Sequence, residues 1–298
     1  MDNSLKQGGR ELIHGLKTGT ATAPLITIIT STFNAAKDLS WTINSIKAQN
    51  YPNIQWIVAD GGSTDGTVEL LQQNEDIIDY WFSAPDKGIY DAWTKALKHA
   101  SGEWIQFIGA GDELAGPEVI TKVAQQLADA HPQYELAYGN IEIISEGLRQ
   151  HIEYIGEPWE TLGIKWQGIR PALPIHPEVF HHKTIFQRIT FNQYKIAGDS
   201  YIVLSSILRK EPLYINLLID RMPHGGISTN PKNILLTYQE LKKINKSLGI
   251  RPPKVSAFTF LVRSLLKAFI LKNFPSAFNI IGDLYRILTL RKVKWTKK

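Results

Sequence analysis

Cysteine is absent from all 298 residues of the chain. Its absence excludes disulfide bonds, thiolate metal sites and a cysteine nucleophile, and it suits a reducing compartment. Long apolar runs are absent too: none reaches the ~20 residues that a membrane-spanning helix needs, and residues 1–24 lack the apolar core of a signal peptide. We therefore expect residues 1–23 to be a loose leader and the protein to be cytoplasmic.

Acidic residues are nearly missing from the C-terminal end. Residues 251–298 contain eleven lysines and arginines and one acid, Asp283, which leaves 22 basic and 27 acidic residues in the rest of the chain. Apolar side chains recur at helical spacing through residues 254–274, with basic residues beside them. This pattern predicts a basic amphipathic helical region over 231–298, whose segment 251–298 binds a membrane surface. Packing of this helix on the rest of the protein is the alternative, and the many Leu, Ile and Phe residues argue against nucleic acid.

Apolar, β-branched runs alternate with helix-like stretches in the region 24–230. Strand-like runs are each followed by a short turn of glycine and polar residues, at 25–30, 54–59, 77–82 and 104–108. This order predicts an α/β fold with a mostly parallel central sheet and helices on both faces. Because ligands bind at the carboxyl ends of such strands, we expect the polar turns to form one site at one edge of the sheet.

The pattern is less regular after residue 112. Residues 135–138 and 141–144 are strand-like, and the Trp- and Pro-containing stretch 151–175 is expected to be a variable loop. Residues 231–250 and 254–274 have helical periodicity. We therefore expect a helical appendage after the α/β domain.

The fourth strand-like run ends in Gly109-Ala-Gly-Asp112. Three small residues in succession leave backbone and space free beside the carboxylate of Asp112. A divalent metal ion and a diphosphate have room to approach it there. Capping of the following helix is the alternative role for this aspartate.

Four segments, in their order and spacing, resemble family 2 glycosyltransferases of the GT-A fold, a Rossmann-like α/β fold: Ile26–Asn34, Val58–Thr67, Asp86–Ala92 and Gly102–Asp112. The likeness is strongest to bacterial enzymes of exopolysaccharide, capsule or lipopolysaccharide assembly. The resemblance implies an inverting transfer of hexosyltransferase type, from a UDP-, GDP- or dTDP-sugar to a hydroxyl of a glycan or lipid-linked acceptor. It also implies a position at the inner face of the plasma membrane.

The resemblance gives Asp112 the place of the last carboxylate in the family's metal motif, although the earlier carboxylate of that motif is absent here. A Mg²⁺ or Mn²⁺ ion at this place would neutralise the charge of the leaving diphosphate. His224 lies in a glycine-bearing loop that resembles a closing loop of some GT-A enzymes. The resemblance therefore implies that His224 adds a metal ligand or a phosphate contact.

The resemblance also assigns the nucleotide pocket to the turns after the strands. Asp60 and Gly61 match the base and ribose pocket, where the family often has two consecutive acids. Thr30 and Asn34 would contact the nucleoside, with ordinary turn chemistry as the alternative. The other nucleotide-binding candidates match positions near the diphosphate: Asp86, Lys87, Asp91 and Gly111. A solvated surface lysine and an ion pair between residues 87 and 91 on one helix are the alternatives there.

An inverting transfer needs a base that takes the proton of the acceptor hydroxyl. By resemblance Asp199, which follows Ala197-Gly198, is this catalytic base, and a plain helix cap is the alternative. His176 matches a histidine near the acceptor, against the simpler reading of a structural histidine. We expect His181 and His182 at the surface.

Two other classes of function remain in view. A non-catalytic protein that binds a sugar or nucleotide, or that scaffolds an assembly at the membrane surface, is the alternative, because the metal motif has a single carboxylate. A nucleotidyltransferase fits less well, because the turn Ser31–Asn34 after the first strand lacks a glycine-rich basic loop.

Overall fold

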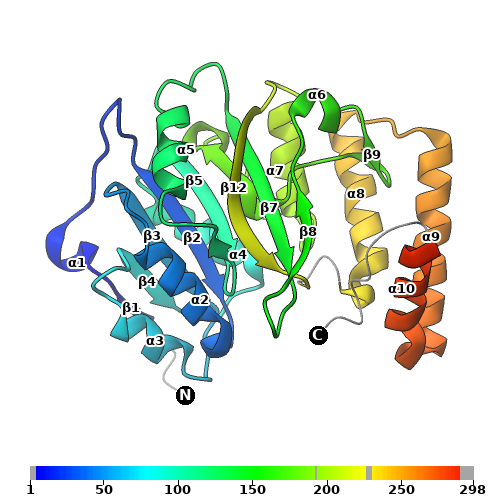
Figure 1. Cartoon of the computed structure of the whole chain (residues 1–298), viewed down its shortest axis with the longest axis horizontal. Coiled ribbons are helices and arrows are strands. Elements are labelled where there is room, and N and C mark those ends of the chain that lie inside the picture. Colours follow the sequence, from blue (N-terminus) through cyan, green and yellow to red (C-terminus); the bar gives the residue numbers. More distant parts are fainter. Residues whose placement is uncertain (1–4, 192, 226–229, 289–298) are drawn as a thin grey trace.

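The computed structural model describes residues 5–191, 193–225 and 230–288. Its centre is a 10-stranded sheet with the order β1-β4-β3-β2-β5-β11-β7-β12-β6, to which β8 is added beside β7. Helices cover both faces of this sheet (Figure 1). The prediction of an α/β fold with a mostly parallel central sheet is confirmed.

Four parallel strands form the half of the sheet that carries most of the predicted site residues. β2 lies between β3 and β5, and β4 lies on the other side of β3. These strands are buried on both faces, which explains why their sequences are continuous apolar runs rather than alternating patterns. Their bounds, with those of the helices that connect them, are β2 (Ile26–Thr32), α2 (Ala36–Lys47), β3 (Ile54–Asp60), α3 (Thr67–Gln73), β4 (Tyr80–Ser83), α4 (Ile89–Ala96) and β5 (Trp104–Gly109).

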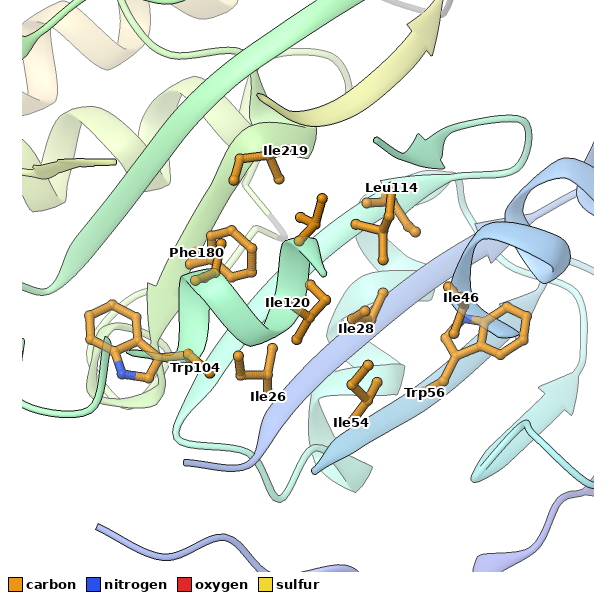
Figure 2. Packing of buried hydrophobic residues seen from close by; sticks show 14 of the residues in the cluster. Ile26, Ile28, Ile46, Ile54, Trp56, Trp104, Leu114, Ile120, Phe180 and Ile219 are labelled. Carbon is orange, nitrogen blue, oxygen red and sulfur yellow. The ribbon is translucent and has the colours of Figure 1, made fainter. Parts of the chain in front are cut away.

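Two hydrophobic clusters hold the helices on the sheet. One of them packs α2, α3 and α5 (Val119–Leu127) on one face, through residues such as Ile28, Trp56 and Ile120 (Figure 2). The other packs α4 and α7 (Gly198–Ile207) on the opposite face, through residues such as Ile29. Successive residues of a strand point to opposite faces, so one apolar strand supplies both clusters.

The second half of the sheet is mixed. β11 (Val179–His182) runs antiparallel between β5 and β7 (Leu136–Ile144), and β12 (Leu213–Pro223) runs parallel to β7. The short strand β6 (Glu113–Leu114) pairs antiparallel with β12. This pairing brings β12 beside the loop that follows β5.

Two parts of this half differ from the sequence prediction. The two strands predicted at 135–138 and 141–144 are one continuous strand, β7. The stretch predicted as a variable loop contains regular elements, because its apolar residues alternate and pair locally: β8 (His151–Ile155), α6 (Trp159–Leu162), β9 (Trp166–Gln167) and β10 (Arg170–Pro171).

The N-terminal segment is bound to the domain instead of forming the loose leader that the sequence predicts. β1 (Lys6–Gly8) pairs antiparallel with β4, and the short helix α1 (Glu11–His14) follows it. Asp79, which is 1% exposed, attracts the ammonium group of Lys17 at 2.9 Å and the guanidinium of Arg10 at 3.5 Å. Main-chain pairing and these ion pairs together attach residues 6–17.

The C-terminal region is helical over its described residues, as predicted. α8 (Ile234–Leu248) packs on α7 through a third hydrophobic cluster that includes Ala197, Leu204 and Leu241. α9 (Lys254–Asn273) and α10 (Phe278–Leu288) lie outside α8, at the end of the molecule (Figure 1). Over the described ranges, every helix is too short or too polar to cross a bilayer.

Candidate active site

Asp60, at the end of β3, organises the turn that follows it. Its side chain is only 1% exposed. The carboxylate accepts five hydrogen bonds of 2.5 to 3.1 Å, from the hydroxyls of Thr32, Ser63 and Ser83 and from the backbone N–H groups of Gly62 and Ser63. The sequence predicts the nucleotide pocket at Asp60 and Gly61. In the structure this turn is held in place by hydrogen bonds to both oxygens of the Asp60 carboxylate.

Asn34 joins the turn after β2 to the turn after β3. Its side-chain oxygen accepts the N–H of Thr64 at 3.0 Å, and its own N–H donates to Ser63 Oγ at 2.7 Å. The residue has a φ of 48°, a left-handed conformation that asparagine tolerates. Thr30 is different: it is fully buried and its hydroxyl accepts the indole N–H of Trp56 at 3.0 Å. Its side chain supports the core and has no surface to offer a ligand.

Phe33 is a candidate nucleotide-binding residue that the sequence analysis missed. Its side chain is 66% exposed although it is large and apolar. A Cβ atom added at Gly61 would come within 3.2 Å of the Phe33 ring and 2.7 Å of the Asp86 carboxylate. Gly61 thus lies between an exposed ring and a carboxylate, and a side chain at this position would displace one of them. The signal in the sequence that could have pointed to Phe33 is an aromatic residue directly after the strand β2.

The turn that contains Asp86 and Lys87 leads into α4. Asp86 accepts the N–H of Gly88 at 2.8 Å, and the N–H of Lys87 donates to the Asp91 carboxylate at 3.1 Å. Asp91 also forms an ion pair with Lys95 at 2.8 Å. The alternative of an ion pair between Asp91 and Lys87 is therefore not realised, because Asp91 pairs with Lys95, and Lys87 is exposed beside the turn.

Asp112 folds back on its own loop. Its Oδ2 accepts the N–H of Gly109 at 2.6 Å, and its side chain is 7% exposed. Helix α5 begins only at Val119, so the alternative role of Asp112 as a helix cap is wrong. Burial raises the pKa of Asp112 to about 7, although the Gly109 N–H and the charge of Arg149 oppose the rise. Gly111 has a φ of 98°, and a Cβ atom there would come within 3.6 Å of Pro223. Pro223, the residue before His224, therefore lies beside the Asp112 loop.

Arg149 supports this loop from the turn between β7 and β8. Its guanidinium donates to the carbonyl oxygen of Gly111 at 2.8 Å and forms an ion pair with Glu113. It also lies 4.5 Å from the ring centre of Trp41 on α2, as a cation–π contact. Its side chain is 9% exposed. Arg149 therefore joins the loop of Asp112 to two other elements of the fold.

Two buried acids were also missed by the sequence analysis: Asp220, which is near Asp112, and Glu178, which is near Asp220. Asp220 on β12 is fully buried, and within the described part of the chain neither of its carboxylate oxygens has a hydrogen-bond partner. Burial raises its pKa well above the usual range, and the charges of Asp112 and Glu178 raise it further. Burial likewise raises the pKa of Glu178 to about 9. Glu178 therefore holds a proton at neutral pH.

The donor set around Asp112 suits a metal ion that arrives with its substrate. Over the described residues, no group of three His, Cys, Asp or Glu side chains converges to hold a metal. Mg²⁺ commonly takes one or two protein carboxylates and completes its shell with waters and substrate phosphates. Asp112 offers one such carboxylate, which fits this partial coordination.

Asp199 lies in the first turn of α7, among groups from three other segments. Its Oδ1 accepts the N–H of Ser200 at 2.7 Å and lies 3.1 Å from the hydroxyl of Tyr90, which also bonds the carbonyl of Ile196 at 2.8 Å. Burial lowers the pKa of Arg170, and the charge of Asp199 opposes that shift. The cap position of α7 is Ala197, so Asp199 is not the plain helix cap of the alternative reading.

His176 belongs to an aromatic cluster. Its ring stacks on Trp93 at 4.9 Å and on Phe107 at 5.4 Å, and both of its ring nitrogens are buried without a hydrogen-bond partner in the described part of the structure. Burial lowers its pKa to about 4, although the Asp199 charge opposes this. The ring is therefore neutral at pH 7, and it lies within electrostatic reach of the candidate base.

The prediction that His181 and His182 are at the surface is wrong. His181 is fully buried and His182 is 7% exposed. Both lie on β11, in which all four residues are buried, so neither face of this strand meets solvent. His182 stacks on His131, with ring centres 3.7 Å apart.

Comparison with known proteins agrees with this geometry. The sequence profile named glycosyl transferase family 2 matches residues 27–190, which is more than half of the chain. An uncharacterized glycosyltransferase of Mycobacterium tuberculosis is 29% identical over 212 residues, which cover 70% of this chain and 78% of that protein. A putative teichuronic acid biosynthesis glycosyltransferase of Bacillus subtilis, TuaG, is 34% identical over 93 residues, 30% of this chain and 37% of its own. A PGL/p-HBAD biosynthesis glycosyltransferase of Mycobacterium bovis is 31% identical over 132 residues, 43% of this chain and 50% of its own.

Two solved structures have a similar fold. The mannosyltransferase PcManGT from Pyrobaculum calidifontis, in complex with GDP-Man and Mn²⁺, superposes with a TM-score of 0.56 at 17% identity, over 95% of this chain and 86% of that one. TarS 1-349 of S. aureus, in complex with UDP-GlcNAc, gives a TM-score of 0.55 at 16% identity, over 88% of this chain and 77% of that one. The chain spans 46% of the longer TarS structure. At these identities the likeness concerns the fold, which is of the GT-A type.

The architecture is thus that of a GT-A glycosyltransferase. The chain belongs to glycosyl transferase family 2.

Proposed function

We propose that this protein is an inverting glycosyltransferase that moves a hexosyl group from a nucleotide-diphosphate sugar to a hydroxyl of a glycan or lipid-linked acceptor. One observation carries the proposal: in a family 2 chain, the turns of Asp60 and Asp86 and the loop of Asp112 follow adjacent parallel strands at their carboxyl ends. The names of the relatives, PGL/p-HBAD and teichuronic acid biosynthesis, support an acceptor from the assembly of cell-surface glycans.

The nucleoside would lie on the joined turns after β2 and β3. The exposed ring of Phe33 offers a stacking surface for the base, and Asn34 and Gly61 lie directly beside it. Asp86 would accept hydrogen bonds from the nucleoside, and Lys87 would offset the charge of the diphosphate. The UDP-GlcNAc and GDP-Man complexes of proteins with a similar fold support this class of donor.

Asp112 would hold a Mg²⁺ or Mn²⁺ ion, with His224 as a further ligand or phosphate contact. The ion supplies Lewis-acid chemistry, by neutralising the charge that develops on the leaving diphosphate. The backbone N–H of Gly109 and the guanidinium of Arg149 hold the loop, and so fix the position of the Asp112 carboxylate. The Mn²⁺ ion in the PcManGT complex supports this choice of metal.

Asp199 would act as the base. Its Oδ1 is occupied by Ser200 N–H and the Tyr90 hydroxyl, which leaves Oδ2 for the proton of the acceptor hydroxyl. His176 would be a neutral ring on the acceptor side of the site, near Asp199. Its pKa of about 4 prevents it from holding a proton at pH 7.

The outer C-terminal helices would place the enzyme on the inner face of the plasma membrane. Apolar side chains are exposed along α9, with Phe258 at 68%, Leu265 at 52% and Phe269 at 58%. On α10, Ile280 and Leu284 are exposed at 56% and 54%. Lysines and arginines interleave with these residues, as anionic headgroups would require.

Turnover assays with UDP-, GDP- and dTDP-sugars in Mn²⁺ test the reaction. We expect sugar release or transfer from one donor class, its loss on chelation of the metal, and at least a hundredfold lower rate in Asp112→Ala and in Asp199→Asn. Full turnover in both variants contradicts the mechanism. Tight donor binding without turnover, with any acceptor, favours the non-catalytic scaffold.

Vesicle sedimentation tests the membrane surface. We expect binding to anionic vesicles, weaker binding to neutral ones, and loss of binding in a Phe258→Ser, Phe269→Ser double variant whose donor turnover in solution is unchanged. Equal binding of the wild type and the double variant contradicts this part of the proposal.

A further inference from the structure

Glu240 of α8 bonds three consecutive backbone amides in front of α7. Its Oε1 accepts the N–H of Lys195 at 2.8 Å, and its Oε2 accepts the N–H groups of Ile196 and Ala197, each at 2.9 Å. Its side chain is buried, with 9% exposure. A buried carboxylate that binds three successive N–H groups fixes the direction of the backbone at that point.

The bonded segment leads directly to Asp199. Helix α7 begins at Gly198, and Asp199 lies in its first turn. The Tyr90 hydroxyl donates to the carbonyl oxygen of Ile196, the middle residue of the segment that Glu240 holds, and also lies 3.1 Å from Asp199 Oδ1. Glu240 therefore acts on the backbone that carries the candidate base from one side, and Tyr90 from the other.

The same C-terminal helices also hold the short hairpin of β9 and β10. Asn245 of α8 donates to the carbonyl oxygen of Ile169 at 2.6 Å, and Ser256 of α9 donates to that of Gly168 at 2.5 Å. Gly168 and Ile169 directly precede Arg170, whose pKa responds to the charge of Asp199. The C-terminal helices are thus attached to both segments that meet at Asp199.

We propose that Glu240 is a positioning residue for Asp199, so that helix α8 is a working part of the acceptor side of the site. This inference rests on the proposed function, because it gives Asp199 the role of base. Glu240 itself contacts no reacting atom. Its effect is to keep the Asp199 carboxylate at the distance and angle that proton transfer requires.

The test compares Glu240→Gln with Ile244→Val. Glutamine keeps the shape of the side chain but has one acceptor oxygen in place of two, so at least one of the three amides loses its bond. We expect kcat to fall roughly tenfold with the KM of the donor within about twofold, because the donor turns lie on other elements. Ile244 lies one turn further along α8 and is fully buried in the third hydrophobic cluster, between α7 and α8. Its truncation should lower the melting temperature by about 2–4 °C and leave kcat unchanged.

Two further measurements separate positioning from general destabilisation. Amide hydrogen exchange at residues 195–197 should accelerate in Glu240→Gln while exchange at residues 60–65 stays the same. In an Asp199→Asn background, Glu240→Gln should lower the remaining rate by less than about twofold, since the group that it positions is already disabled.

Unchanged kcat in Glu240→Gln, with faster exchange at 195–197, overturns the proposal. So does an equal fall in kcat in the Ile244→Val control or in the Asp199→Asn background. A wild-type rate in Asp199→Asn alone refutes the base assignment in the proposed function, and the exchange data then still report whether Glu240 holds the segment.

Discussion

Replacement of Asp60 tests whether the nucleotide-side turn depends on one buried carboxylate. The variants Asp60→Asn and Asp60→Ala separate the shape of the side chain from its charge. In asparagine, the amide oxygen can still accept from the N–H groups of Gly62 and Ser63 and from Ser83. The amide NH₂ then faces the hydroxyls of Thr32 and Ser63, which are able to turn and accept.

The magnitudes follow from that difference. Asp60→Asn loses charge assistance and the hydrogen bonds that the Thr32 and Ser63 hydroxyls donate, but it keeps an acceptor for Ser83 and for both backbone N–H groups. The free energy of unfolding should therefore fall by about 1–2 kcal/mol. Asp60→Ala removes an acceptor of five hydrogen bonds at a site that is 1% exposed. Two backbone N–H groups of the partly buried turn and three hydroxyls then lose their acceptor, and we expect a loss of ~3–5 kcal/mol.

Urea unfolding followed by tryptophan fluorescence measures these values, and calorimetric titration with UDP or GDP measures the effect on the site. The two variants should differ by at least ~1 kcal/mol in stability, and only Asp60→Ala should lose the nucleotide through disorder of the turn. Equal stability of the two variants would refute the reasoning, because it would mean that the hydrogen bonds at Asp60 contribute little.

Three further predictions concern other groups of the site. Because burial raises the pKa of Glu178 from 4.5 to about 9, the folded state keeps a proton that the unfolded state releases. Wild-type stability should therefore fall by up to ~1.4 kcal/mol per pH unit between about pH 5 and 9, and urea unfolding of Glu178→Gln should show a flatter dependence. Arg149→Gln should cost ~2–4 kcal/mol of stability because it leaves Glu113 without its buried partner; a matched change at the exposed Lys122, of 0–1 kcal/mol, is the control, and equal effects would contradict the argument. Phe33→Ala should weaken UDP or GDP binding about tenfold in calorimetry, with unchanged stability; Phe258→Ala, at an exposed ring on α9, should have no effect on binding.

The sequence predicted the parts of the site that are encoded locally. Each of the turns after β2, β3, β4 and β5 follows an apolar run, so its place at one edge of a parallel sheet can be inferred from the order of elements alone. Asn34, Asp60 and Asp112 are found in this way. The family motifs lie in the same local segments.

The groups that the sequence analysis missed are brought to the site by long-range pairing. Asp220 reaches the Asp112 loop because β12 pairs with both β7 and β6, and Arg149 reaches it from the turn after β7. A short histidine-bearing strand gives no sign that both of its faces are buried, which is why His181 was predicted at the surface. Glu240 lies in a region that periodicity identifies only as an appended helix.

The pairing of β1 with β4 has a consequence for how the molecule behaves in solution. β4 would otherwise be the edge of the sheet, with a row of unpaired N–H and C=O groups available to another chain. The three residues Lys6–Gly8 cover that row, and the lysine side chain of Lys6 adds a charge at the new edge. Removal of the first 23 residues would therefore expose the unpaired edge of β4. It would also remove the ion pairs that Arg10 and Lys17 form with the buried carboxylate of Asp79. We therefore expect the N-terminal segment to protect the protein against edge-to-edge aggregation, and expression of the domain without it to yield associated protein.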